Sequence, residues 1–238
     1  GVTVGDFTVH NAKDSNGYRI LYISVFVGVF LFLLLFKKEI GKRVELGFLI
    51  ISMTIGMLFI ALQPPQFTSW DEHIHFYHVF DFFDGKHVDW NQAEYYAYIN
   101  PESMEKVAFT SKEEKALQIQ YFNENTQDSG YSYDKSSFTV SRLGYLHMAI
   151  VVAAGKFIGL PFYVVYLLGK IANLMMYCIL MFFAIKSIPI AKNLLAALAL
   201  MPTPMVLATA YSYDVALIGF LSLGTAMLIR EFYYPEKK

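Results

Sequence analysis

Residues 20–36 read ILYISVFVGVFLFLLLF, and residues 46–62 read LGFLIISMTIGMLFIAL. Neither stretch contains a charged residue. A helix of this length rises about 25 Å, which is the lower limit for crossing a bilayer. The linker of residues 37–43, KKEIGKR, carries four cations. Because cytoplasmic loops are rich in Lys and Arg, we expect this linker to be cytoplasmic and the far ends of both helices to lie outside.

The composition supports a membrane protein. Of the 238 residues 55% are hydrophobic and only 16% are charged, whereas soluble domains carry about 25% charged residues. The shortage of charge excludes a disordered chain, a basic nucleic-acid binder and most soluble enzymes, and the single cysteine excludes a disulfide scaffold. The net charge of −1 is the sum of two unlike parts. Residues 63–143 hold thirteen acidic and six basic side chains, and the rest of the chain holds seven acidic and thirteen basic side chains. We therefore predict an integral membrane protein with one long acidic outer loop and no nucleic-acid partner.

The second half of the chain allows two paths through the membrane. In the first, residues 143–160 cross inward, which leaves all later cations outside. In the second, residues 143–160 lie along or dip into the outer face, 162–185 span inward, 190–204 return and 213–229 span inward again. We favour the second path because it places the later cations in the cytoplasm. The expected fold is all-α and polytopic, with about five to six transmembrane helices and interfacial helices in the outer loop.

The start of the acidic loop concentrates polar residues beside the membrane, where residues 69–78 read SWDEHIHFYH. Ser69 can cap a helix, with Glu72 at the capping-box position. On such a helix Asp71, His75 and His78 fall at i, i+4 and i+7 on one face. A carboxylate and two imidazoles at a partly apolar boundary are typical of general acid–base sites.

Plainer interpretations of the same segment remain open. The helix can be an interfacial anchor whose Phe76, Phe80 and Phe83 lie in the headgroup layer, and its acidic pair can be a simple helix cap. The three histidines of the segment fit a metal ion by residue type, but their HxHxxH spacing is a weak zinc pattern.

Two further charged residues stand in apolar surroundings. Lys170 lies in the run YVVYLLGKIANLMMY, and a cation at the centre of a span costs about 2.5–3.5 kcal/mol. On the second path Lys170 comes near the outer end of its span, where it can snorkel or meet a lipid phosphate. Asp214 follows ATAYSY and reaches the same side, where a carboxylate needs a partner.

These segments resemble a bacterial membrane family catalogued as domain of unknown function 2142. Residues 64–76 resemble its P-x-DE-x-x-H-F signature, residues 145–170 its Tyr-rich segment followed by an intramembrane cation, and residues 201–214 its M-P…S-Y-D element. The likeness covers roughly residues 44–230. That family is similar to the GT-C superfamily of polytopic glycosyltransferases, which take a sugar from a polyprenyl-phosphate donor at the outer face of the membrane.

The resemblance implies roles for individual residues. Asp71 matches the acidic position that acts as catalytic base or metal ligand, with Glu72 as its neighbour. Lys170 stands where relatives carry a cation, usually Arg, that meets the donor phosphate, and Asp214 matches the second acidic motif. His75 matches the histidine of the signature; we expect it, together with His78, to contact substrate or metal. The sequence does not decide whether a divalent cation takes part.

The chain also departs from the family pattern. Trp70 replaces the usual Pro before the acidic pair, and Lys in place of Arg gives a point charge instead of a bidentate fork. GT-C enzymes have more spans and longer chains, so we expect this one to be truncated. We divide it into an outer tail (1–19), a first transmembrane helix with its cytoplasmic turn (20–43) and a GT-C-like membrane module (44–238).

The functional expectation is a glycosyltransferase-like protein of the bacterial plasma membrane, with the 63–143 loop outside. Its partners are membrane lipid, a polyprenyl-phosphate-linked sugar and a glycan or other acceptor whose identity the sequence does not give. Two alternatives remain: a non-catalytic protein that binds lipid-linked glycan, and a metal-dependent membrane enzyme built on Asp71, His75 and His78.

Overall fold

The computed structural model of the chain describes residues 17–62, 69, 71–80, 82–83, 116, 120 and 140–234. Most of the acidic loop thus lies outside the described residues. In the described part almost every residue is helical and none forms a strand, which confirms the predicted all-α class. The helices are α1 (Gly17–Leu35), α2 (Lys37–Lys42), α3 (Val44–Leu62), α4 (Glu72–Phe80), the 3₁₀ helix η2 (Val140–Tyr145), α7 (Leu146–Phe157), α8 (Phe162–Ser187), α9 (Lys192–Ala199), α10 (Pro202–Ala208) and α11 (Asp214–Tyr233).

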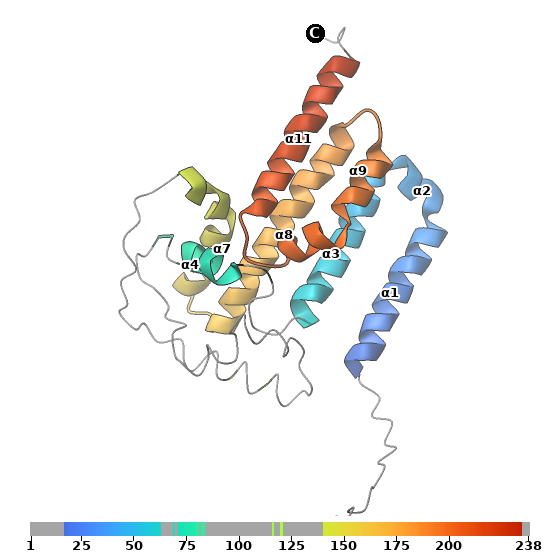
Figure 1. The fold of residues 1–238 in the computed structure, drawn as a ribbon. Coiled ribbons are helices and arrows are strands. Elements are labelled where there is room, and N and C mark those ends of the chain that lie inside the picture. The colour runs from blue at the N-terminus through green and yellow to red at the C-terminus, as the bar shows by residue number, and fades with distance from the viewer. Residues whose placement is uncertain are drawn as a thin grey trace, which may run out of the picture.

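Three of these helices, α3, α8 and α11, are long and apolar enough to cross a membrane. The apolar part of α1 (Ile20–Leu35) is shorter. The length and hydropathy of these helices confirm the membrane character expected from the sequence. In Figure 1 the chain runs up α1, down α3, up α8, part of the way down through α9 and α10, and up again along α11.

Seven basic side chains of the described residues collect at one end of this bundle. The α1–α3 linker, the α8–α9 turn and the last turns of α11 all lie at the upper end in Figure 1. We call this the basic end; its cations are Lys37, Lys38, Lys42, Arg43, Lys186, Lys192 and Arg230. The opposite end, where α3 stops and α8 begins, is here called the site end. This course follows the second of the two paths, in which all these cations share one side.

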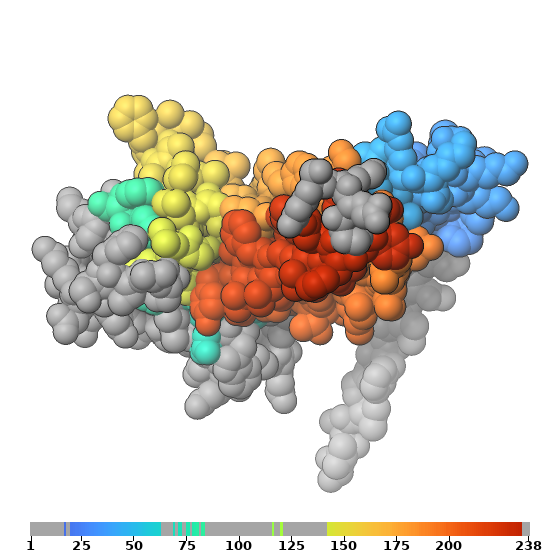
Figure 2. All heavy atoms as spheres, turned by 90° about the horizontal axis from the view of Figure 1, so that it is seen from above, coloured from blue at the N-terminus to red at the C-terminus, as the bar shows by residue number. Residues whose placement is uncertain are grey.

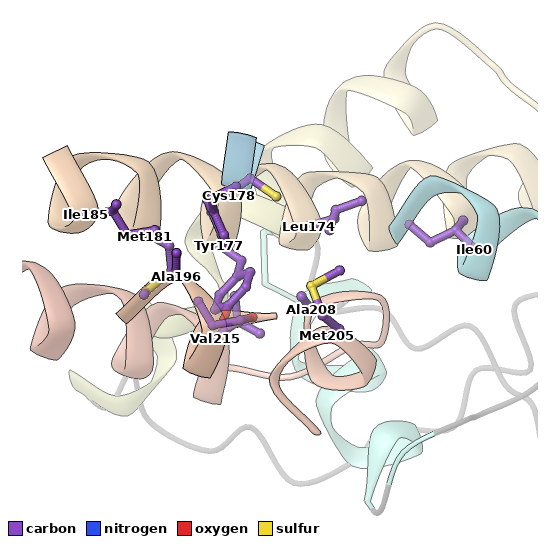
Figure 3. Close-up of a cluster of buried hydrophobic side chains, with 12 residues drawn as sticks. Ile60, Leu174, Tyr177, Cys178, Met181, Ile185, Ala196, Met205, Ala208 and Val215 are labelled. Atoms are coloured by element: carbon purple, nitrogen blue, oxygen red, sulfur yellow. The ribbon is translucent and has the colours of Figure 1, made fainter. Parts of the chain in front are cut away.

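Helix α8 is the central element, because α3, α7 and α11 all pack along it. Small residues on the neighbours allow close approach: a Cβ added to Gly56 of α3 would lie 2.5 Å from Leu174, and one added to Gly219 of α11 would lie 2.6 Å from Leu180. Figure 3 shows the resulting core, in which Leu174, Tyr177 and Met181 of α8 face Met205, Ala208 and Val215.

The descending segment α9–α10 is broken, as its two prolines predict. Carbonyl groups of this segment accept hydrogen bonds from side chains of α8. The Tyr177 hydroxyl donates to the Ala199 carbonyl at 2.7 Å, and the Asn173 amide donates to the carbonyls of Leu207 at 3.2 Å and Ala210 at 2.7 Å. Non-helical backbone at membrane depth is tolerated only where such groups are satisfied, and α8 satisfies them both at the break, through Tyr177, and at the end of α10, through Asn173.

The packing contacts also give the depth of the site end. Helix α3 has 19 residues, about 28 Å, close to the thickness of the hydrocarbon core. Because Gly56 faces Leu174 and the two helices run in opposite directions, α3 ends near the level of Leu168. The parallel contact of Gly219 with Leu180 then places Asp214 about 10 Å deeper than the end of α3. Measured along α8, the first residue of α11 therefore lies farther into the bundle than the end of α3.

A lateral group of helices covers the site end of α8. Helices α4 and α7 and the segment η2 lie on one side of the molecule, with α1 and α2 on the opposite side (Figure 2). The two aromatic side chains Phe76 and Phe80 are 0% and 3% exposed and pack with Phe162, Tyr166 and Tyr211. The interpretation in which these two side chains lie in the headgroup layer is therefore wrong, because this face of α4 is covered by protein. Phe83 remains exposed.

Candidate functional site

A fully buried ion pair joins α4 to the central helix. Glu72 Oε1 lies 3.1 Å from Lys170 Nζ, and the two side chains are 0% and 1% exposed. The ammonium also lies 4.9 Å from the ring centre of Tyr166, a cation–π contact. Removing two charges from water is unfavourable unless each finds close partners. Each charge here has the other as its partner, although the two residues are 98 positions apart in the chain.

Two backbone N–H groups also donate hydrogen bonds to the Glu72 carboxylate. Tyr211 N donates to Oε1 at 2.9 Å, and Ser69 N donates to Oε2 at 3.1 Å. The second bond is the half of the predicted capping box in which the glutamate reaches back to the cap residue. The Ser69 hydroxyl does not complete the box, since it has no hydrogen-bond partner among the described residues. Glu72 thus fixes the entry of α4 against α8 and the α10–α11 turn.

Tyr211 reaches Glu72 because Gly169 leaves room for its ring. A Cβ on Gly169 would lie 2.7 Å from Tyr211 Cζ. The Tyr211 hydroxyl donates to the Tyr166 carbonyl at 2.7 Å. Burial, reinforced by the Glu72 charge, raises the pKa of the Tyr211 phenol well above its usual value, so it stays a hydrogen-bond donor. The turn before α11 is in this way locked onto α8.

Asp71 precedes α4 and has a different environment from its neighbour. Its side chain is exposed, and its backbone adopts φ = 59°, the left-handed region. Asp tolerates this conformation better than most residues, yet it costs free energy, and such positions cluster at functional sites. The Asp71 carbonyl accepts the His75 N–H at 3.2 Å. The structure therefore separates the acidic pair into a buried Glu72 and an open Asp71.

His75 belongs to a group of aromatic side chains from three elements. Its Nδ1 lies 2.6 Å from the hydroxyl of Tyr145, the last residue of η2. Its ring meets Tyr213, just before α11, edge-on at 5.3 Å between centres, and Tyr213 meets Tyr145 in the same way at 5.7 Å. His78 lies beside Tyr145 at 5.4 Å. We call His75, His78, Tyr145 and Tyr213 the histidine–tyrosine cluster.

Asp214 adjoins this cluster as the first residue of α11. The Ser212 hydroxyl donates to its Oδ2 at 3.0 Å, and its own N–H donates to Ser212 Oγ at 3.0 Å. A carboxylate in the first turn is stabilised by the helix dipole, which is the plain explanation for its presence. Its charge also acts on Tyr145. Burial, Tyr213 and Asp214 raise the pKa of that phenol, and Arg142 opposes them.

The structure brings most of the predicted site residues to the site end. Glu72 contacts Lys170 directly, and the Tyr211 amide ties the segment before Asp214 to the same carboxylate. No distance between Asp71 and Lys170 falls within contact range. In this conformation the Lys170 ammonium faces Glu72, so the role in phosphate binding stays a prediction.

A metal centre receives no direct support from the described residues, in which no three His, Cys, Asp or Glu side chains converge. The His73 side chain and Trp70 lie outside the described residues. Tyr145, Tyr211 and Arg142 were not anticipated as site residues. Tyrosine is common at membrane interfaces, so the two tyrosines carry no distinguishing signal by themselves. The available hints were the position of Tyr211 three residues before Asp214 and that of Tyr145 at the start of the Tyr-rich segment.

Comparison with known proteins places the chain in a family but assigns it no activity. No curated protein and no solved structure matches it. The model of the family described as "Predicted membrane protein (DUF2142)" matches residues 53–238. That range includes the acidic motif of α4, Lys170, the histidine–tyrosine cluster and Asp214. The chain belongs to the DUF2142 family of membrane proteins.

Proposed function

We propose that this protein is a glycosyltransferase-like membrane protein. It transfers a sugar from a polyprenyl-phosphate donor to a glycan or another acceptor at the outer face of the bacterial plasma membrane. The observation that carries the proposal is the contact of Glu72 with both Lys170 and the Tyr211 amide. This contact brings two acidic motifs, far apart in sequence, to the same end of the bundle. A lipid-linked donor and a water-soluble acceptor can meet at that end of the bundle.

The proposed reaction needs a base, and Asp71 suits that task better than Glu72. Its carboxylate is exposed, whereas both oxygens of Glu72 accept hydrogen bonds from buried donors. Asp71 takes the proton of the acceptor hydroxyl, whose oxygen forms a bond to the anomeric carbon. The bond from that carbon to the phosphate oxygen breaks, and polyprenyl phosphate leaves with the electron pair. A divalent cation held by Asp71 is the alternative way to use the same carboxylate.

The ion pair has a positioning role in this proposal. Lys170 is 1% exposed, so a donor phosphate can reach its ammonium only if Glu72 moves away. We therefore assign Glu72 and Lys170 to holding the start of α4, and with it the left-handed backbone of Asp71. The positive charge near the phosphate then has to come from another group or from a bound cation.

The experiment is a transfer assay with protein reconstituted in liposomes. A panel of polyprenyl-phosphate hexoses is supplied, and release of free polyprenyl phosphate is followed by mass spectrometry. Asp71→Asn should lower turnover by about 10²–10⁴-fold, the contribution of a general base, with unchanged thermal unfolding. Glu45→Gln at the basic end is the matched control and should retain wild-type turnover. Full transfer by the Asp71 variant rules out its role as base.

A second candidate function is non-catalytic binding of lipid-linked glycan. The sequestration of Lys170 by Glu72 favours it, because a transferase needs a cation to stabilise the charge that develops on the leaving phosphate. This alternative predicts that wild-type protein retains the polyprenyl-phosphate sugar in the same liposomes yet releases no polyprenyl phosphate, with or without Mg²⁺ and Mn²⁺.

A further inference from the structure

We propose that Tyr213 and Asp214 form a binding site for the pyranose ring of a sugar. The exposed side of the Tyr213 ring packs against C–H groups of the sugar, and Asp214 accepts a hydrogen bond from one of its hydroxyl groups. That this sugar belongs to the lipid-linked donor or to the acceptor glycan rests on the proposed function. The binding itself does not depend on any reaction.

The Tyr213 side chain is exposed although the residues directly before it are buried. Its exposed fraction is 40%, whereas Tyr211 and Ser212 are 0% and 1% exposed. In the part of the chain that the structure describes, its ring meets those of His75 and Tyr145, and its hydroxyl group has no hydrogen-bond partner. A large aromatic surface therefore remains uncovered in the histidine–tyrosine cluster.

Contacts with three residues fix the position of this ring. It lies edge-on to His75 at 5.3 Å and to Tyr145 at 5.7 Å between ring centres. Gly144 lies against the first atoms of the side chain, because a Cβ added to this glycine would be 2.9 Å from Tyr213 Cβ. An aromatic side chain that is already held in place loses little conformational entropy when a ligand binds.

The backbone around Tyr213 is anchored as well. The Tyr211 N–H donates to Glu72 Oε1 at 2.9 Å, which ties the turn to α4. The Tyr213 carbonyl accepts the N–H groups of Ala216 at 3.0 Å and Leu217 at 3.2 Å, which ties it to the first turn of α11. The exposed ring is thus carried by a turn that is held from both sides.

Asp214 places a hydrogen-bond acceptor next to the ring. The Ser212 hydroxyl donates to its Oδ2 at 3.0 Å and so orients the carboxylate. The other oxygen, Oδ1, accepts no hydrogen bond from the described residues, and the residue is partly exposed. Carboxylate oxygens are strong acceptors for hydroxyl donors. Oδ1 can therefore bind a hydroxyl group that approaches over the Tyr213 ring.

A sugar combines the two properties that this pair of residues recognises. Its C–H groups form an apolar patch that packs on an aromatic ring, whose face carries partial negative charge, and its hydroxyl groups donate hydrogen bonds. A prenyl chain has no hydroxyl group for Asp214, and a phosphate is repelled by the carboxylate. Of the three parts of a lipid-linked sugar, the sugar therefore fits this pair best.

Saturation-transfer NMR tests the site without any reaction. The full chain in nanodiscs is mixed with the methyl glycosides of glucose, galactose, mannose and N-acetylglucosamine, and the aromatic protons of the protein are irradiated. At least one glycoside should receive saturation at its ring C–H protons, and the acyclic polyol sorbitol should receive none. Tyr213→Phe should keep the signal because the ring remains. Tyr213→Leu should weaken binding about 5–10-fold through the loss of the aromatic contact.

Tyr233→Leu is the matched control. Tyr233 is 54% exposed at the basic end and lies edge-on to Tyr234, so its loss should leave the signal unchanged. Asp214→Asn should weaken binding about 5-fold, because a charged acceptor forms the stronger hydrogen bond. Thermal unfolding of each variant separates lost binding from lost folding. If no glycoside receives saturation, or if Tyr213→Leu and Tyr233→Leu bind equally well, Tyr213 is an ordinary interface tyrosine and the proposal fails.

Competition distinguishes the two sources of the sugar. Displacement of the glycoside by polyprenyl-phosphate hexose, but not by polyprenyl phosphate, assigns the site to the donor sugar; displacement by neither assigns it to the acceptor. Equal displacement by both lipids means that the ring binds the prenyl chain, which overturns the proposal. Glycoside binding in a protein that transfers no sugar contradicts the proposed function alone. Sugar transfer with an unchanged KM in Tyr213→Leu contradicts the sugar site alone.

Discussion

Glu72 and Lys170 form an ion pair whose side chains are 0% and 1% exposed, so each depends on the other as its partner. Glu72→Gln leaves the ammonium buried without its counter-charge, which should lower the free energy of unfolding by about 3–5 kcal/mol. Replacing both partners with Glu72→Gln and Lys170→Met should restore most of this loss, because no unpaired charge remains. The measurement is unfolding in detergent followed by circular dichroism.

The exposed pair of Lys42 and Glu39 at the basic end is a matched control. Its atoms are 3.3 Å apart, but both side chains are more than two thirds exposed. Surface pairs of this kind contribute little, so Glu39→Gln should leave unfolding nearly unchanged. Equal losses for Glu39→Gln and Glu72→Gln contradict the view that burial gives the site pair its importance.

His147 gives the protein a predictable dependence on pH. Its Nε2 lies 2.9 Å from Asn173 Oδ1, and both amide protons of Asn173 are donated to carbonyl groups. Burial lowers the pKa of His147, with the Asn173 hydrogen bond acting in the opposite direction. Because the unfolded chain then binds the proton more readily than the folded one, stability is full above about pH 6.5 and falls as the pH drops below that value.

His147→Gln tests this dependence, since glutamine can donate to Asn173 and does not titrate. Thermal unfolding should weaken between pH 7.5 and pH 5 in the wild-type protein and weaken less in the variant. The difference between the two curves isolates His147 from the other histidines. Parallel curves mean that His147 does not contribute.

At the scale of elements, the contact between α8 and the α10–α11 turn is sensitive to a single methyl group. Gly169→Ala places a Cβ against the buried ring of Tyr211. The displaced ring withdraws the Tyr211 N–H from Glu72, so we expect a loss of about 1–3 kcal/mol in unfolding free energy. Gly224→Ala in α11 meets no atom within 4 Å and should be neutral or stabilising by up to about 1 kcal/mol. Chemical denaturation of both variants in the same detergent compares them; equal stability would show that the Tyr211 ring can move at no cost.

Sequence patterns predicted the elements better than their contacts. The apolar stretches of residues 20–36 and 46–62 correspond to α1 and α3 within a few residues, because hydrophobic length is a local property. The prolines at 202 and 204 mark the observed break between α9 and α10. The capping pattern predicted a helix that starts directly after Ser69, whereas α4 begins at Glu72 after the left-handed residue Asp71, and one of the two bonds of the pattern forms.

The tertiary pairing could not be deduced in the same way. Every face of an intramembrane helix is apolar, so hydrophobic periodicity does not indicate which helices touch. Lys170 was recognised as unusual from its surroundings, but its partner was not, since Asp71 and Glu72 are adjacent and chemically alike. The left-handed backbone at Asp71 decides which carboxylate turns outward. The surroundings of Phe76 and Phe80 were not predicted correctly for a similar reason, because an apolar face that packs on protein and one that lies in lipid consist of the same side chains.

At the scale of the whole molecule, the distribution of cations predicts the orientation in the membrane. The basic end should be cytoplasmic, which places the site end and the 63–143 loop outside. Alkaline phosphatase inserted after residue 100 should therefore be active in a bacterial host, and green fluorescent protein fused after residue 238 should fluoresce. Alkaline phosphatase inserted after residue 43 is the control and should be inactive. The reverse pattern of reporter activities would place the site in the cytoplasm and exclude an outer-face transferase.

The break between α9 and α10 has a consequence for biogenesis. The Ala199 carbonyl at this break, and the Leu207 and Ala210 carbonyls at the end of α10, accept hydrogen bonds from side chains of α8. A segment that depends on a neighbour for its hydrogen bonds cannot enter lipid alone. During synthesis it has to wait beside the translocon until α8 is in place and be released together with it, so that this part of the protein is integrated into the bilayer as a single unit.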